Sequence, residues 1–196
     1  MSSVRDPLSR DAIIEAAWTQ AAEHGLDSLS TRTVAARLDV TPMALYRHVR
    51  DMDEIVGAVV DGLLAERGLP VADVDWREWL QQLARSLRGL FLKHPAAVGL
   101  FIRQPVTTPA ARIRLEATVG VLVEAGFTRH DAVRAYAAVH TYTIGFCGLE
   151  AGRLRAPAPV EPLDAAQDPT SVAIRGFVTD EQFAYGLRAL VYGLVP

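Results

Sequence analysis

Residues 41–50 gather positive charge on one short segment of this 196-residue chain. The segment contains Arg47, His48 and Arg50 and no acidic residue, whereas the rest of residues 1–50 holds four arginines against six carboxylates. Arginine offers a planar fork of donors that matches phosphate oxygens and the edge of guanine. The segment therefore predicts contact with a polyanion and, through Arg47, recognition of a base edge.

Two short helices with a tight turn between them must position these side chains. Ser30 is a favourable N-cap for a helix over 30–38, and Pro42 suits the first position of a second helix over about 42–49. The turn falls at residues 38–40. This arrangement is a helix-turn-helix, whose second helix is placed for the major groove of DNA.

The remaining chain shows helical periodicity almost throughout. Apolar residues at spacings of three and four predict helices over 9–24, 51–67, 75–94, 95–102, 109–125, 128–152 and 180–194. We find no strand pattern and no internal repeat, and four prolines predict a loop over 154–178. The expected fold is all-α: a three-helix helix-turn-helix head over 1–50, a connector helix over 51–67 and a helical bundle over 68–196.

Composition excludes several classes of protein. The net charge of −3 argues against a general polyanion binder, although it hides the basic segment at 41–50. A single cysteine rules out a disulfide framework and a cysteine-rich zinc site. No signal peptide is evident, and the longest uncharged apolar stretch, 135–149, is shorter than the roughly 20 residues of a membrane span. We expect a cytoplasmic protein.

The ingredients of catalysis are poor. Cys147 lies in an apolar helix and is better explained as a small buried hydrophobe than as a nucleophile. His94, His130 and His140 belong to no metal-ligand or acid–base pattern, and no glycine-rich phosphate loop follows a strand. The sequence therefore predicts no enzyme activity, no cofactor and no metal site.

Three motifs in the first part of the chain resemble the TetR family of bacterial transcriptional repressors. They are LSTRTVAA at 29–36, VTPMALYRHV at 40–49 and DMDEI at 51–55. Residues 76–79, 103–105, 126–127 and 140–145 are similar to the C-terminal domain of the tetracycline-repressor subgroup. The resemblance implies a homodimer that binds a palindromic double-stranded operator and releases it when a small ligand enters the C-terminal domain.

The motif and the residue chemistry together assign the DNA contacts. Tyr46 and His48 resemble the phosphate-contacting pair of the family, which fixes register. Arg47 is placed to read a guanine, and Met43 or Ala44 to contact a thymine methyl. The predicted DNA-binding residues are Arg32, Thr33, Thr41, Met43, Ala44, Tyr46, Arg47 and His48.

One position departs from the family pattern. Many relatives carry a lysine that contacts phosphate at the start of the fourth helix, where this chain has Met52. Its absence should weaken the electrostatic part of DNA binding, and Arg50 is the candidate substitute.

The last two long helices, over 128–152 and 180–194, correspond to the dimer interface of the family. Their small residues permit close helix approach, but the same pattern fits packing within one chain. These residues are Ala135, Ala138, Gly145, Gly148, Ala184 and Gly186.

The helix over 109–125 carries apolar residues on most of its surface, so we expect it to be buried and to border an effector cavity. His140 fits a core histidine as well as a ligand contact. The tetracycline-type magnesium site is not expected, because Leu100 and Phe101 stand where a histidine would be needed. The candidate effector residues are Leu83, Leu87, Phe101, Arg103, Gln104, Thr118, Leu122, His140 and Thr143. A ligand-independent DNA-binding protein of the same fold remains the alternative.

Overall fold

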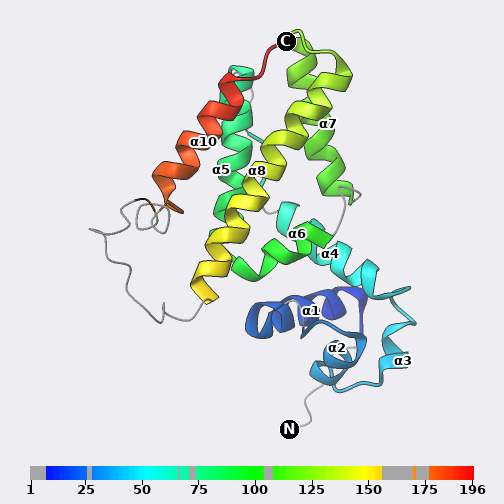
Figure 1. Cartoon of the computed structure of the whole chain (residues 1–196). Coiled ribbons are helices and arrows are strands. Elements are labelled where there is room, and N and C mark those ends of the chain that lie inside the picture. The colour runs from blue at the N-terminus through cyan, green and yellow to red at the C-terminus, as the bar shows by residue number, and fades with distance from the viewer. Residues whose placement is uncertain are drawn as a thin grey trace. The chain divides into compact units, whose positions relative to one another are not determined.

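The computed structural model describes residues 8–25, 28–65, 67–70, 74–103, 108–155, 170 and 177–196, without the side chains of four of them (Ala96, Arg103, Leu154 and Arg155). This part of the chain contains helices and no strand, which confirms the all-α prediction (Figure 1). The helices are α1 (Arg10–His24), α2 (Thr31–Arg37), α3 (Pro42–Leu45), α4 (Met52–Ala65), α5 (Trp76–Lys93), η2 (Pro95–Ala97), α6 (Val98–Arg103), α7 (Pro109–Glu124), α8 (Arg129–Arg155) and α10 (Asp180–Tyr192).

Side-chain caps begin several helices where the sequence predicted them. Ser9 accepts from Ala12 N–H at the start of α1, and Asp75 accepts from Arg77 N–H at the start of α5. At the end of α1, Gly25 takes φ 79°, a conformation that L side chains rarely adopt. These helix boundaries are therefore set by local hydrogen bonds and backbone conformation rather than by packing against other helices.

Residue contacts divide the chain into two compact units. One unit comprises residues 1–68 and 96–112, and the other comprises residues 69–95 and 113–196. In the first unit α1 packs against α2 and α4, and α2 packs against α3. Its apolar core includes the fully buried Ile13, Val34, Leu45 and Ile55, which hold the three head helices and α4 together.

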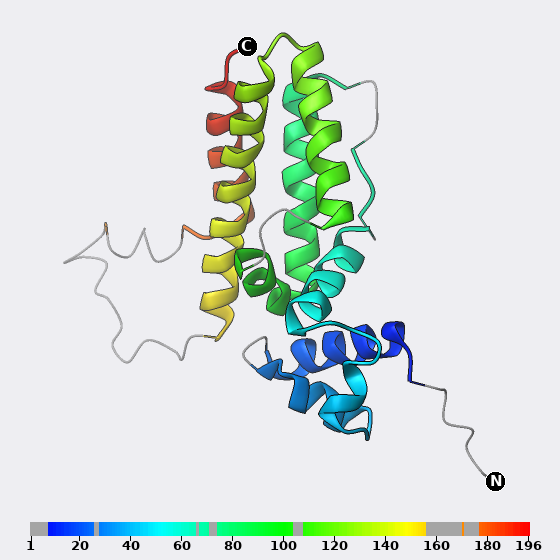
Figure 2. The same cartoon turned by 90° about the vertical axis from the view of Figure 1, so that its right-hand side faces the viewer.

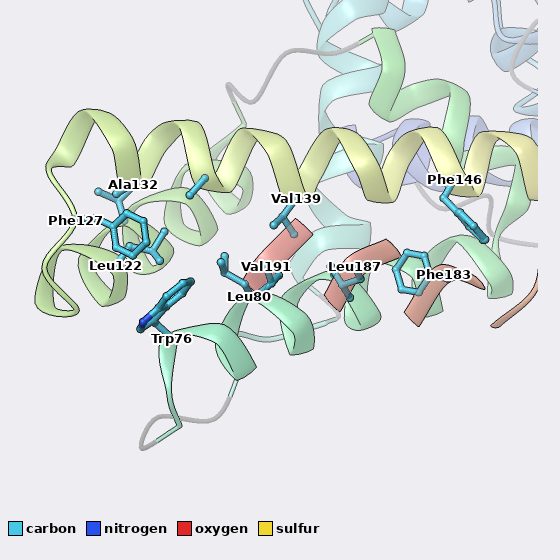
Figure 3. Packing of buried hydrophobic residues seen from close by; sticks show 13 residues of the cluster. Trp76, Leu80, Leu122, Phe127, Ala132, Val139, Phe146, Phe183, Leu187 and Val191 are labelled. Atoms are coloured by element: carbon cyan, nitrogen blue, oxygen red, sulfur yellow. The ribbon is translucent and has the colours of Figure 1, made fainter. Parts of the chain in front are cut away.

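The second unit is built on α5, α8 and α10, which contact one another pairwise. Figure 2 shows α8 and α10 running alongside each other. Their core holds buried apolar side chains from these helices, from α7 and from the turn between α7 and α8 (Figure 3). It includes Trp76, Leu80, Leu122, Phe127, Ala132, Val139, Phe146, Phe183, Leu187 and Val191.

Three predicted features differ from the structure or lie outside it. Regular helix α3 ends at Leu45, and turns with His48 and Val49 N–H groups on the Leu45 carbonyl complete the segment expected over 42–49. Helix α8 continues to Arg155, into the start of the predicted loop, and most of the rest of 154–178 lies outside the described residues. Helix α7 is less buried than expected, because Ile113 is 61% exposed.

Candidate DNA-binding and effector sites

The first of the two short helices is anchored by a reciprocal cap. Ser30 Oγ accepts from Thr33 N–H at 3.1 Å, and Thr33 Oγ1 accepts from Ser30 N–H at 3.0 Å. Buried Val34 and Ala35 pin the inner face of α2. Arg32 is left exposed at the start of the helix, where a long cationic side chain can reach a phosphate or a base.

The turn between the helices depends on one residue in the left-handed region. Asp39 has φ 54°, the one non-glycine residue with positive φ in the described part of the chain. Aspartate tolerates this conformation better than most residues. Val40 N–H then donates to the Ala35 carbonyl at 3.0 Å, which closes the turn and aims the chain into α3.

Opposite faces of the 41–49 segment have opposite character. Leu45 is fully buried and Val49 is 4% exposed. Met43 is 72% exposed, and Arg47 and His48 also face solvent. A hollow on the surface is lined by Thr41, Met43, Ala44, Tyr46 and Arg47, so five of the predicted DNA-binding residues share one patch.

Two of the predicted residues are positioned in ways the sequence did not reveal. The hydroxyl of Tyr46 lies 3.1 Å from that of Thr31, so a contact from α2 orients the ring. Thr41 occupies the N-cap position of α3 but makes no side-chain cap hydrogen bond. Its exposed hydroxyl is therefore not committed to helix capping.

Thr33, for which the sequence predicts a phosphate contact, has a structural role within the head. Its hydroxyl donates to the Ser28 carbonyl at 2.7 Å, with the Ser30 carbonyl at 3.0 Å, while it caps α2. A hydroxyl has a single proton to donate. In the DNA-free chain that proton is donated within the head, so the predicted phosphate contact would require the hydroxyl to exchange this acceptor for a phosphate oxygen.

Arg50, the candidate substitute for the lysine that is absent at position 52, is paired with the carboxylate of Glu54. Glu54 accepts from Arg50 N–H at 2.9 Å and pairs with the Arg50 and Arg10 guanidinium groups at 3.3 and 3.2 Å. The backbone hydrogen bond from Arg50, then the contact with Arg10, lowers the pKa of Glu54. Arg50 nevertheless remains 83% exposed on its side chain.

The predicted effector residues are distributed over both units. Leu83, Leu87, Leu122, Thr118, Thr143 and His140 belong to the second unit, whereas Phe101 belongs to the first. Gln104 and the side chain of Arg103 lie outside the described residues. The aliphatic members are buried, and Leu122 belongs to the core cluster in Figure 3, so this residue has a packing role.

The threonine hydroxyls of this set are satisfied inside the protein. Thr143 Oγ1 donates to the Val139 carbonyl at 2.8 Å. Thr118 Oγ1 donates to the Arg114 carbonyl at 2.8 Å and accepts from the indole N–H of Trp79 at 3.2 Å. Both side chains are fully buried. Toward a ligand, these two hydroxyl groups can therefore act only as hydrogen-bond acceptors.

The structure adds two polar residues that sequence reasoning missed. Arg114 on α7 is 6% exposed and Tyr136 on α8 is 7% exposed. The Tyr136 ring stacks on His140, with centroids 5.4 Å apart and planes at 17°. Arginine is rarely buried, so its residue type pointed to the surface. The one sequence signal for burial of Arg114 was the apolar pattern of α7, which extends almost all round the helix.

An ionic contact centred on a mostly buried arginine joins α5, α8 and α10. Arg88 on α5 pairs with Glu150 on α8 at 2.6 Å and with Asp180 on α10, and lies 4.7 Å from the Phe183 ring centroid. The pKa of Arg88 is raised, first by the hydrogen bond to Glu150. Nearby Cys147 is buried, and its burial raises the pKa of the thiol to about 12, unlike that of a nucleophile.

Comparison with known proteins places the chain in a family. Residues 13–59 match the model of bacterial regulatory proteins of the tetR family, and residues 69–195 match the tetracyclin repressor-like C-terminal domain. The chain belongs to the TetR family of transcriptional regulators. No helix in the described residues is long and apolar enough to cross a membrane.

Two curated relatives show how far the likeness extends. The class A tetracycline repressor from transposon 1721 of Escherichia coli is 32% identical, and the match covers 95% of this chain and 90% of that protein. An HTH-type transcriptional regulator of Saccharopolyspora erythraea is 34% identical over 76% of this chain. The match covers 64% of that relative, less than two thirds of its length.

Solved structures include one with a small molecule and one with DNA. ActR of Streptomyces coelicolor in complex with actinorhodin has a TM-score of 0.80 at 27% identity, covering 96% of this chain and 97% of that one. BioQ with its double-stranded DNA operator has a TM-score of 0.75 at 27% identity, covering 95% of this chain and 98% of that one.

Proposed function

We propose that this chain is a ligand-responsive transcriptional repressor that binds a palindromic operator as a homodimer and is released by a small molecule. The observation that carries the proposal is the 41–49 segment, where buried Leu45 and Val49 present Met43, Tyr46 and Arg47 to solvent. The operator complex of BioQ and the actinorhodin complex of ActR support the DNA and effector parts.

In the proposed complex the 41–49 segment lies in the major groove. Arg47 reads a guanine through two hydrogen bonds, and Met43 and Ala44 contact thymine methyl groups. Tyr46 and His48 bind phosphates and set the register, while Arg32 contacts the backbone or a base from the start of α2. The proposed site of action is the bacterial cytoplasm, on the nucleoid when DNA is bound.

We propose that α8 and α10 form the dimer interface. On α8 a row of exposed residues at four-residue spacing has small residues between two apolar ones: Val133, Ala137, Thr141, Gly145 and Leu149. On α10, Tyr185 and Tyr192 are 63% and 65% exposed, with exposed Ala189 between them. Exposed apolar and small residues of this kind favour burial against a second copy. Two recognition helices could then be held about 34–36 Å apart, one turn of DNA.

Two of the small residues expected at that interface instead pack within the chain. Ala135 is 2% exposed and belongs to the core cluster. A β-carbon at Gly186 would overlap the hydroxyl of Tyr142, so Gly186 allows α10 to approach α8 closely. The interface proposal therefore does not depend on either residue.

The link from effector to DNA is proposed to pass through α4 and α7. Within the first unit, the Asp61 carboxylate of α4 accepts from Ala110 N–H in the first turn of α7 at 2.6 Å. Helix α7 starts in this unit and continues into the other, where it carries Arg114 and Thr118. A ligand that favours a different position of α7 would act on α4, provided that it binds the DNA-free form more tightly.

The decisive experiment is selection of bound DNA from a random pool by the full chain. A palindromic consensus is expected, because two equivalent heads read two half-sites. A Tyr46→Ala/His48→Ala double variant should then lose affinity for the selected site and for unrelated DNA alike, with a flatter salt dependence. Selection of no consensus, or unchanged operator affinity in the double variant, would contradict the proposal. Release of this operator by a bound small molecule distinguishes it from a ligand-independent DNA-binding protein.

A further inference from the structure

A groove of about 240 Å³ lies between α1 and α4 within the first unit. Its lining residues, which define the α1–α4 groove, are Asp11, Ile14, Glu15 and Trp18 of α1 and Ala58, Val59, Gly62 and Leu63 of α4. None of the predicted DNA-binding or effector residues is among them. Asp11, Glu15 and Gly62 are exposed in the whole chain, so the groove is open to solvent.

The space in the groove depends on small residues of α4. Ala58 and Gly62 lie one turn apart, and a β-carbon at Gly62 would meet no other atom within 4 Å. A glycine inside a helix costs about 1 kcal/mol relative to alanine, and no neighbour within this distance requires one here. Val59 and Leu63, which are 3% and 5% exposed, supply apolar surface beneath. The absence of a side chain at Gly62 therefore leaves an apolar depression open.

The α1 side of the groove carries unmatched negative charge. Asp11 and Glu15 are four residues apart on α1, so their carboxylates are neighbours on one face, a spacing at which like charges repel. Within the described residues no ion pair joins either carboxylate to a cation, and no lining residue is basic. Arg10, the nearest arginine in the sequence, is paired with Glu54. A cation in the groove would relieve this repulsion.

Trp18 adds an aromatic surface to the two carboxylates. It follows Glu15 by three residues on α1, which places both side chains on the same side of the helix. The face of an indole attracts an ammonium group within about 6 Å. Hydrogen bonds from an ammonium to a carboxylate are charge-assisted. Carboxylates, an indole and an apolar floor together are suited to an organic cation and are unfavourable for an anion.

We propose that the α1–α4 groove binds a small aromatic ammonium ion. Its ammonium group pairs with Asp11 and Glu15, and its ring packs against Trp18 and the apolar floor of the groove. The volume is below the range of about 300–1,000 Å³ that is typical of sites for drug-sized ligands, so the fitting cation has one or two rings. This is a second ligand site, separate from the candidate effector residues, and its test depends on neither operator nor effector.

Three probes with the same indole ring separate charge from shape. Tryptamine is the cation, 3-ethylindole is the neutral analogue without the amine, and indole-3-propionate is the anion. Each is titrated at neutral pH into the full, nitrogen-15-labelled chain, and the indole N–H signals of its three tryptophans are followed by NMR. Trp18→Phe identifies the Trp18 signal. The unlabelled probes contribute no signal of their own.

The wild type should show a saturable shift of the Trp18 signal with tryptamine, at a Kd below about 1 mM. Asp11→Asn/Glu15→Gln keeps the shape but removes the charge, and should weaken tryptamine at least about tenfold without changing 3-ethylindole. Gly62→Leu should exclude both probes, because its side chain fills the groove. Glu23→Gln/Asp53→Asn is the matched control, since it removes the same charge from α1 and α4 outside the groove, and should bind like wild type.

Several results would overturn the proposal. They are no saturable shift of the Trp18 signal in the wild type, equal affinity for the three probes, and retained tryptamine binding in the Asp11/Glu15 variant or in Gly62→Leu. An equal loss in the control variant would show that tryptamine responds to the overall charge of the protein instead of the groove. Melting temperatures establish that each variant is folded, and Gly62→Leu is expected to fold because a β-carbon at this position has open space.

Discussion

The hydroxyl oxygens of Thr31 and Tyr46 lie 3.1 Å apart and join the first residue of α2 to the end of the recognition helix. A tyrosine side chain that rotates freely in the free protein would lose this rotational freedom when it binds a phosphate. Here the contact holds the ring before DNA arrives. The proposed phosphate contact is therefore preorganised by a residue that has no assigned contact of its own.

That relationship gives a double-mutant prediction. Thr31→Val should weaken operator binding by about 0.5–1.5 kcal/mol, because the Tyr46 hydroxyl loses its partner. In a Tyr46→Phe background the same change should have almost no effect, since the two side chains act as a unit. Operator affinities of the four proteins, measured at one salt concentration, give the coupling. Additive losses would show that the contact does not position Tyr46 for DNA.

Arg47 should control sequence preference more than overall affinity. Arg47→Ala is expected to relax specificity at one or two operator positions, with a loss of about 1–3 kcal/mol for the preferred base. Affinities for a panel of single-substituted operators measure this directly. The Tyr46→Ala/His48→Ala variant is the contrast, because it should lower all affinities in the panel together. A uniform loss in Arg47→Ala would place this side chain on phosphate instead.

Gly145 offers a clean test of the dimer interface. A β-carbon at Gly145 meets no other atom within 4 Å in the single chain, and the same is true of Gly120 on α7. Gly145→Arg should therefore leave the protomer folded but separate the dimer, since a charged side chain would be buried at the interface. Gly120→Arg is the matched control and should remain dimeric. Sedimentation at micromolar concentration distinguishes the monomer from the dimer. If the Gly145→Arg protein is dimeric, the dimer interface lies on another surface of the chain.

Gly186 should be intolerant of any side chain for a reason internal to the protomer. Its β-carbon would displace the Tyr142 hydroxyl, which donates to the Phe183 carbonyl at 3.0 Å. Gly186→Ala is expected to cost about 1–3 kcal/mol of stability through overpacking. Gly120→Ala, in an open helical position, should instead stabilise by up to about 1 kcal/mol. Urea unfolding of both variants checks the opposite signs.

Asp61 should contribute to stability through the first turn of α7. Removal of the carboxylate leaves Ala110 N–H without this acceptor, so Asp61→Ala should lose about 0.5–2 kcal/mol. Asp53→Ala, at an exposed position of the same helix, should change stability far less. If α4 responds to α7 through this contact, Asp61→Ala will also bind operator normally but release it poorly with effector. Normal release would exclude this route.

Sequence alone predicted the elements whose causes are local. The helices predicted over 9–24 and 75–94 begin directly after the caps Ser9 and Asp75, and α3 begins at Pro42 as predicted. The buried Leu45 and Val49 also follow from the 3–4 apolar spacing. The end of regular helix at Leu45 did not, because helix ends depend on turn geometry that residue type specifies weakly.

The candidate effector site was less predictable, because burial is decided by packing between distant segments. Arg114 looked like a surface residue by type, whereas Ile113 next to it looked like core; the structure reverses the two, with 6% and 61% exposure. Thr33 shows the same limit in the head. Its residue type predicts a phosphate contact but not the hydrogen bond that its hydroxyl donates to the Ser28 carbonyl at 2.7 Å.

Glu54 has a consequence for the ionic strength dependence of DNA binding. Its carboxylate gives Arg50 and Arg10 a counterion built into the protein. A DNA phosphate that approaches either arginine must compete with this carboxylate, so part of the ion exchange takes place between protein and DNA rather than with bulk cations. The slope of log affinity against log salt would then report fewer cationic groups near the duplex than are present. Glu54→Gln would restore a steeper slope while leaving the set of arginines unchanged.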